Sequence, residues 1–231
     1  MQKIYLILIT IFINKILTQE QYPSFLKLLA IPEGEIFYPS VKRVEKSSIE
    51  ENYVLVYQKK VENVFKIFFI IFNQDLTITQ TETKVLESSK DQTEPKIISF
   101  SDGDFLIVWK TKENCPSLKF TSALFSYNTN IPKLQKELTL CNKYYGELQS
   151  MLNYDIISTQ DDKIFLAWHQ KNGFGNHDYD IFTQIYNKNL TIFKEMTVVK
   201  PFNLEPYDNQ MYPNLMRFDD GNILLAYNSN Y

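Results

Sequence analysis

The sequence has few of the residues that catalytic and metal-binding sites use most often. Two histidines, two cysteines and only two arginines, Arg43 and Arg217, occur in 231 residues. His169 and His177 lie eight positions apart, which is not the i, i+4 spacing of a helical zinc pair, and no cysteine cluster accompanies them. We find no recognised catalytic motif, and we expect both histidines to be incidental and no cofactor to be required.

A strong excess of charge and a long internal apolar run are also lacking. The chain carries 24 basic and 27 acidic residues. This near balance argues against electrostatic binding of nucleic acid. The most apolar internal run, residues 67–72, is far shorter than the roughly 20 residues of a membrane-spanning helix and fits a buried strand. We expect no nucleic-acid partner and no stable membrane span in the mature chain.

The first 19 residues are typical of a secretory signal peptide. Lys3 gives a positive start, residues 4–13 are apolar, and Asn14-Lys15 interrupts that stretch. We expect residues 1–19 to be cleaved, leaving a domain from 20 to 231 that is secreted or held at the cell surface. The sequon Asn189-Leu190-Thr191, a candidate N-glycosylation site, and the cysteine pair are compatible with such an oxidising compartment.

An internal repeat organises the rest of the chain. Residues 95–109 align without a gap with residues 154–168, and Trp109 and Trp168 are 59 positions apart. A further 59 residues on, Tyr227 takes the place of the tryptophan. An earlier copy ends at Tyr57 and has four extra residues between its two strands. The four copies start near residues 38, 94, 153 and 212, and such periodicity is the mark of a repeat architecture.

Each copy predicts four antiparallel strands. Two apolar strands flank a turn, Asp102-Gly103 in copy two and Asp220-Gly221 in copy four, and Asp-Gly predicts a type I′ hairpin. Copy three has Asp161-Asp162 there. Third strands are expected at 66–73, 120–128 and 180–187, and fourth strands near 134–141 and 193–199. The pattern predicts an all-β, β-propeller-like array of about four blades; a sandwich is the alternative that the 59-residue period disfavours.

Completeness of the array is a separate question. Copy four ends after its second strand, while residues 26–32 stand where the fourth strand of a preceding copy would stand. Either that segment completes the last blade and closes a small ring, or the chain is an incomplete piece of a longer propeller. We favour the second account because the last blade would still lack a strand.

The motif D-G-x-F-Φ-Φ-x-W, followed by a strand ending in Q-Φ-aromatic-N, resembles tandem repeats of large secreted bacterial and ciliate surface proteins. Copy three is the best match, with Asp161-Asp162, Trp168 and residues 181–187. The resemblance covers roughly residues 38 to 231. It implies propeller-like repeats, which in those proteins often stand next to cadherin-like domains.

Recurring side chains are interpreted first as architecture. One equivalent position holds Tyr57, Trp109, Trp168 and Tyr227. These aromatics are either a ring of sugar-stacking residues or packing residues between blades, and we favour packing because aromatics dominate core burial. The repeated aspartates fall in turns, where an Asp side chain bonds nearby backbone N–H groups, so we expect turn residues rather than acids or ligands.

Features found in one copy are the remaining candidates for a site. In the loop 172–180, Asn176, Asp178 and Asp180 offer oxygens of the kind that Ca²⁺ binds, although the Gly and distant Glu of an EF-hand loop are missing. A plain surface loop is the favoured interpretation. Cys115 and Cys141 fall at the same end of one blade, and a disulfide between them would stabilise the fold by roughly 3 kcal/mol on the chain-entropy model.

Three functions fit this sequence. We expect a non-enzymatic module that presents loops to a protein or glycan partner. The alternative is a sialidase-like propeller glycoside hydrolase, which two arginines disfavour because the sialidase mechanism uses an arginine triad. A third possibility is a truncated fragment of a larger surface protein.

Overall fold

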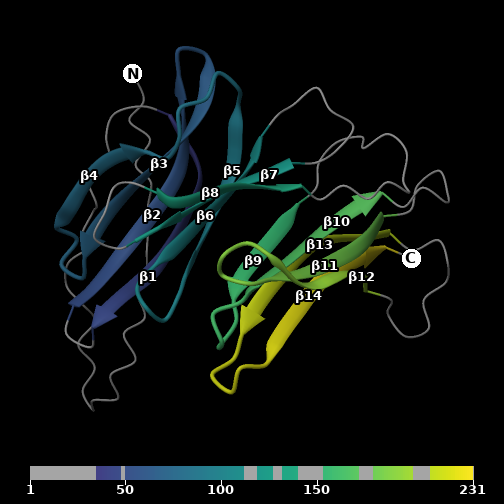
Figure 1. Ribbon diagram of the computed structural model, residues 1–231. Coiled ribbons are helices and arrows are strands. Elements are labelled where there is room, and N and C mark those ends of the chain that lie inside the picture. The colour runs from purple at the N-terminus through teal and green to yellow at the C-terminus, as the bar shows by residue number, and fades with distance from the viewer. Residues whose placement is uncertain are drawn as a thin grey trace, which may run out of the picture.

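The computed structural model describes residues 35–47, 50–111, 119–126, 132–139, 153–171, 179–199 and 209–230. Within these ranges the chain is all-β, and its strands form three four-stranded antiparallel sheets and one two-stranded sheet (Figure 1). The predicted all-β class is therefore confirmed, and the four-stranded sheets match the expected blades. The described residues contain no helix long and apolar enough to cross a membrane.

Each sheet is a simple meander in which consecutive strands are neighbours. The first sheet holds β1 (Ile36–Ser47), β2 (Glu50–Val61), β3 (Val64–Asn73) and β4 (Ile78–Lys84). The second holds β5 (Gln92–Ser99), β6 (Phe105–Thr111), β7 (Lys119–Phe125) and β8 (Pro132–Thr139). The third holds β9 (Tyr154–Ser158), β10 (Ile164–Lys171), β11 (Tyr179–Tyr186) and β12 (Ile192–Val198), and the fourth holds β13 (Asn209–Arg217) and β14 (Ile223–Asn230).

The turns between first and second strands differ from the predicted type I′ turn. Gly103 N donates to Phe100 O, and Phe100 N donates to Asp104 O. Of the three loop residues between Phe100 and Asp104, only Gly103 has a positive φ, 84°. This is a type I turn followed by a left-handed residue, because a three-residue loop needs positive φ only at its last position. Asp162 (φ 57°) and Gly221 (φ 86°) take that position in copies three and four.

The repeated aspartates lie in these turns. Asp102 Oδ1 accepts a hydrogen bond from Asp104 N at 3.1 Å, and Asp220 Oδ1 accepts one from Asn222 N at 2.9 Å. Asp161 Oδ1 accepts from the Thr159 hydroxyl at 2.6 Å. The contacts of Asp102 and Asp220 with the backbone N–H two residues on are those for which Asp is favoured in turns.

Apolar side chains from adjacent sheets form the core. Trp109 lies in the cluster between the first and second sheets, Trp168 lies in the cluster between the second and third, and both are fully buried. Tyr57 is fully buried on the face of the first sheet that carries Leu55 and Phe68. Tyr227 is only half-buried. The first three of these aromatics therefore pack as core residues.

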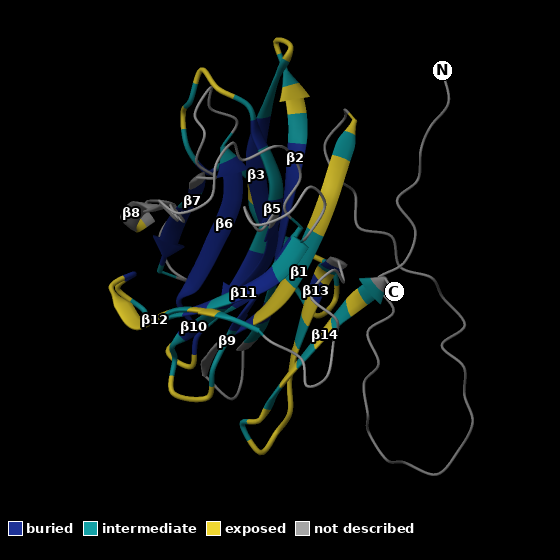
Figure 2. Cartoon of the chain, turned by 90° about the vertical axis from the view of Figure 1, so that its right-hand side faces the viewer, coloured by how far each residue is buried: buried dark blue, intermediate teal, exposed yellow. Residues whose placement is uncertain are grey.

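The fourth sheet is covered less than the others. From Phe105 to Lys110 every residue of β6 is buried, whereas β14 alternates half-buried and exposed residues (Figure 2). Leu224 is 47% exposed. The difference follows from packing on the sheet faces, because the side chains of β6 alternate between the core clusters on the two sides of its sheet, whereas no described residue of β14 belongs to a core cluster.

We predict that Trp168→Ala lowers the free energy of unfolding by about 3–5 kcal/mol, since it opens a cavity in the core between two sheets. The control is Phe218→Ala, at a ring that is 43% exposed, for which we expect a change within about 0.5 kcal/mol. Urea denaturation followed by tryptophan and tyrosine fluorescence gives both values. Equal effects of the two substitutions would contradict the packing role of Trp168.

Candidate functional site

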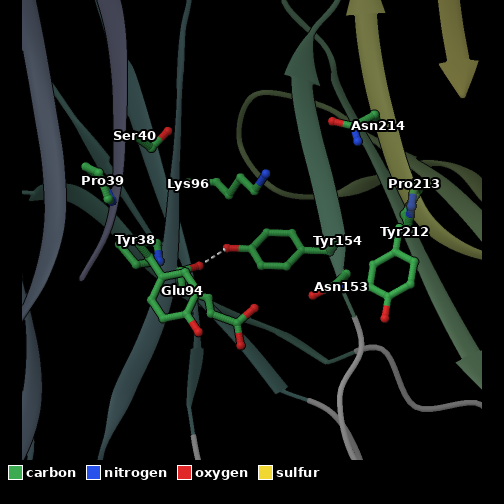
Figure 3. A pocket seen from close by; sticks show the side chains of 11 residues that line it. Tyr38, Pro39, Ser40, Glu94, Lys96, Asn153, Tyr154, Tyr212, Pro213 and Asn214 are labelled. Atoms are coloured by element: carbon green, nitrogen blue, oxygen red, sulfur yellow. Dashed lines mark hydrogen bonds between the residues drawn. The ribbon is translucent and has the colours of Figure 1, made fainter. Parts of the chain in front are cut away.

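The first strands of the four sheets pack against one another in sequence order. β1 packs against β5, β5 against β9, and β9 against β13. Among them is a pocket of about 350 Å³ (Figure 3). It is lined by Tyr38, Pro39, Ser40, Glu94, Pro95, Lys96, Asn153, Tyr154, Tyr212, Pro213 and Asn214. These are equivalent positions of the four copies, so every copy contributes one wall segment.

Three of the four wall segments contain a β-bulge. The pairing register shifts at 37–40 in β1, at 93–96 in β5 and at 211–214 in β13. A proline lies in each bulge, where its missing N–H interrupts no ladder hydrogen bond. Bulges are over-represented next to active sites because they redirect side chains.

The residue before each proline has a left-handed backbone. Its φ is 50° at Tyr38, 52° at Glu94 and 60° at Tyr212. For bulky side chains this conformation costs on the order of 1–3 kcal/mol and persists only where the surroundings impose it. Strained positions of this kind gather at functional sites, and three of them surround one pocket here.

Side chains of neighbouring copies bind the backbone groups that the bulges release from the ladder. Glu94 N donates to Gln58 Oε1 of copy one at 2.8 Å. The Tyr154 hydroxyl of copy three is the hydrogen-bond donor to Glu94 O, at 2.6 Å, and to Val108 O, at 2.9 Å. Tyr212 N donates to His169 Nδ1 at 3.3 Å. The shape of the pocket therefore depends on contacts between copies.

His169 thus has a defined structural place at the pocket wall, and the absence of a catalytic or metal-binding role for it stays a prediction. His169 is buried, and its ring centroid lies 5.6 Å from those of both Tyr179 and Tyr212. The signal was present in the sequence, because Gln58 and His169 both directly follow the recurring aromatic and both accept a hydrogen bond from the next copy. His177 lies outside the described residues.

One carboxylate, Glu94, lines the pocket, and a second from the adjacent copy, Asp155, contacts the lining residue Lys96. Glu94 Oε2 lies 2.5 Å from Lys110 Nζ. Asp155 Oδ1 lies 3.1 Å from Lys96 Nζ, and Asp155 Oδ2 accepts a hydrogen bond from Leu215 N at 2.7 Å. Asp155 therefore links copies two, three and four.

The Tyr154 ring lies among these charges. Lys96 Nζ and Lys110 Nζ are 6.0 and 5.7 Å from its centroid. Burial, with the nearby charges of Glu94 and Asp155, raises the pKa of the Tyr154 phenol well above its usual value, so the hydroxyl stays a hydrogen-bond donor. Burial also lowers the pKa of Lys110, and the hydrogen bond to Glu94 opposes that shift.

The other residues singled out in the sequence lie away from the pocket or outside the described ranges. Asn176, Asp178, Cys115 and Cys141 belong to the second group. Asp180 pairs with Gln170 in the third sheet, and the described residues hold no cluster of three metal-ligating side chains. Asn189 is exposed in the turn before β12, where its Oδ1 accepts from Thr191. The calcium site, the disulfide and the glycan stay predictions.

No protein-family model and no curated protein matches the chain. The α-L-arabinanase of Penicillium chrysogenum, solved with arabinobiose, is 10% identical with a TM-score of 0.54, and the match covers 84% of this chain and 57% of that one. An α-L-arabinofuranosidase of Lactobacillus brevis is 12% identical with a TM-score of 0.46, over 84% of this chain and 65% of that one. The chain thus spans less than two thirds of either structure. The likeness to the arabinanase shows a shared β-propeller-like fold.

These similarities correct the expected function. The expectation of a non-enzymatic module is contradicted by the likeness to the arabinanase, which is a glycoside hydrolase, the class named as the alternative. The small number of arginines weighs only against the sialidase mechanism and not against other glycoside hydrolases. The resemblance to tandem repeats of bacterial and ciliate surface proteins stays a prediction.

We predict that Tyr154→Phe destabilises the protein by about 1–3 kcal/mol, because Glu94 O and Val108 O lose a buried donor. Tyr53→Phe, which keeps a half-buried ring stacked on Phe72, is the matched control and should change stability by less than about 0.5 kcal/mol. Chemical denaturation measures both. If Tyr154→Phe behaved like the control, the hydroxyl would not hold the Glu94 bulge.

Proposed function

We propose that this chain is part of an extracellular glycoside hydrolase of the propeller type. In this proposal the four sheets are blades, and the pocket among β1, β5, β9 and β13 holds the sugar. The observation that carries it is a pocket to which all four copies contribute, with the carboxylate Glu94 in its lining and a second carboxylate of the adjacent copy, Asp155, ion-paired to the lining residue Lys96. Most glycoside hydrolases act through such a pair of carboxyl groups.

The reaction adds water across a glycosidic bond. One carboxylic acid protonates the leaving oxygen as its bond to the anomeric carbon breaks, and the other carboxylate either activates the attacking water or forms a covalent intermediate that water then cleaves. Glu94 lines the pocket and is the candidate acid. Asp155 is the candidate for the second role, because Lys96 and Leu215 N hold both of its oxygens in a fixed orientation.

A neutral sugar is the substrate class that the pocket fits. The two carboxylates and the two lysines form pairs, Glu94 with Lys110 and Asp155 with Lys96, so no single charge sign prevails there. A volume of about 350 Å³ is within the range of small-molecule sites. Because the similar arabinanase was solved with arabinobiose, arabinose-containing oligosaccharides are the first substrates to test.

The extracellular location is part of the proposal. It is supported by the apolar segment 4–13 behind Lys3 and by the exposed sequon residue Asn189. An extracellular enzyme would meet plant or microbial polysaccharides directly.

We predict that Glu94→Gln and Asp155→Asn each lower kcat on an aryl α-L-arabinofuranoside or on linear arabinan by about 10²–10⁴-fold, the usual contribution of a positioned acid or base. Release of the aryl group or of reducing sugar is the measurement. Glu87→Gln, at an exposed carboxylate that pairs with Lys84 outside the pocket, is the control and should retain full activity.

Thermal unfolding of each variant separates loss of chemistry from loss of fold, which matters most for Asp155 because it links three copies. A wild-type protein that turns over none of a panel of aryl glycosides, or variants of Glu94 and Asp155 that keep wild-type kcat, would refute the proposal.

A further inference from the structure

Two tyrosines at the pocket are exposed although their backbone is strained. Tyr38 in copy one and Tyr212 in copy four occupy equivalent positions, and their exposed fractions are 58% and 49%. Both have a left-handed backbone directly before a proline. Burial of a large ring normally offsets part of such a strain, but here about half of the surface of each residue stays in solvent. Core packing therefore does not explain why these positions are aromatic.

The two rings stand on opposite walls of the pocket. Figure 3 shows Tyr38 beside Glu94 on one wall and Tyr212 beside Asn153 on the other, with Tyr154 and Lys96 between them. A ligand that crosses the pocket from one ring to the other passes the Glu94 carboxylate. The equivalent residues of copies two and three are polar, Glu94 and Asn153. The four copies thus supply two aromatic and two polar groups at one backbone position.

The wall that carries Tyr212 is held in place. Its backbone N–H donates to the buried His169, and the two rings lie 5.6 Å apart at 58°. Pro213 fixes the backbone that follows. Because the platform is ordered before a ligand arrives, little conformational entropy is lost on binding.

The exposed face of a tyrosine suits a sugar. The ring face carries partial negative charge, and the C–H groups on one side of a furanose or pyranose ring are weakly positive and apolar. Tyrosine gives a large, rigid contact surface with only two rotatable bonds. Hydroxyl groups at the rim of the sugar can then reach the polar groups of the other two copies.

We propose that Tyr38 and Tyr212 are two sugar-stacking platforms on either side of Glu94, so that the site takes a neutral oligosaccharide of at least two sugar units. This inference rests on the proposed function, because it places the sugar in the same pocket. These platforms are different residues from the recurring aromatics considered for sugar stacking in the sequence. Three of those aromatics are fully buried; the set is Tyr57, Trp109, Trp168 and Tyr227.

The test separates binding from catalysis. In a Glu94→Gln background, which removes turnover, isothermal titration calorimetry measures the affinity for linear α-1,5-linked arabinobiose and arabinotriose. Tyr38→Ala and Tyr212→Ala should each weaken binding about fivefold to tenfold, which corresponds to one aromatic contact. Tyr38→Phe and Tyr212→Phe should stay within about twofold, because stacking needs the ring and not the hydroxyl. Phe218→Ala removes an exposed ring outside the pocket and should have no effect.

The outcomes distinguish this inference from the proposed function. Hydrolysis by the wild type together with unchanged affinity of both alanine variants would overturn the platforms and leave the enzyme in place. Ring-dependent binding without turnover of any glycoside would keep the platforms and refute the hydrolase. Absence of binding by the Glu94→Gln variant at millimolar oligosaccharide, with a wild-type melting temperature, would also overturn the platforms.

Discussion

The structure depends on one constraint, the need of the bulged backbone groups around the pocket to find hydrogen-bond partners. A bulge removes N–H and C=O groups from the sheet ladder, and an unpaired polar group that is buried costs about 1–3 kcal/mol. Here Gln58, Tyr154 and His169 supply the missing partners, and each belongs to a copy next to the bulge it serves. The same contacts hold adjacent sheets in register and fix the walls of the pocket.

Packing and pocket geometry are therefore coupled. Trp168 lies in the core between the second and third sheets, and the next residue, His169, binds the wall that carries Tyr212. One short segment of β10 thus contributes both to the core and to the pocket. A substitution that shifts β10 would change the pocket without touching any residue that lines it.

Much of the fold was predictable from the sequence because strands and turns are local. The 59-residue spacing of Trp109 and Trp168 and the apolar runs around them predict the sheets that are observed. The turn type was missed, since the loop at Gly103 has one more residue than a type I′ hairpin allows. The pocket was missed because it joins segments about 60 positions apart, and the recurring X-Pro pairs at Pro39, Pro95 and Pro213 were the signal that pointed to it.

The shared bulge also bears on how such a protein can diversify. Three of its four copies present this bulge to the pocket, and the lining side chains differ from copy to copy, Tyr-Pro-Ser, Glu-Pro-Lys, Asn-Tyr and Tyr-Pro-Asn. Unequal recombination between duplicated units would exchange whole walls as cassettes. Ligand preference can then change one wall segment at a time, while the wall segments of the other three copies are inherited intact.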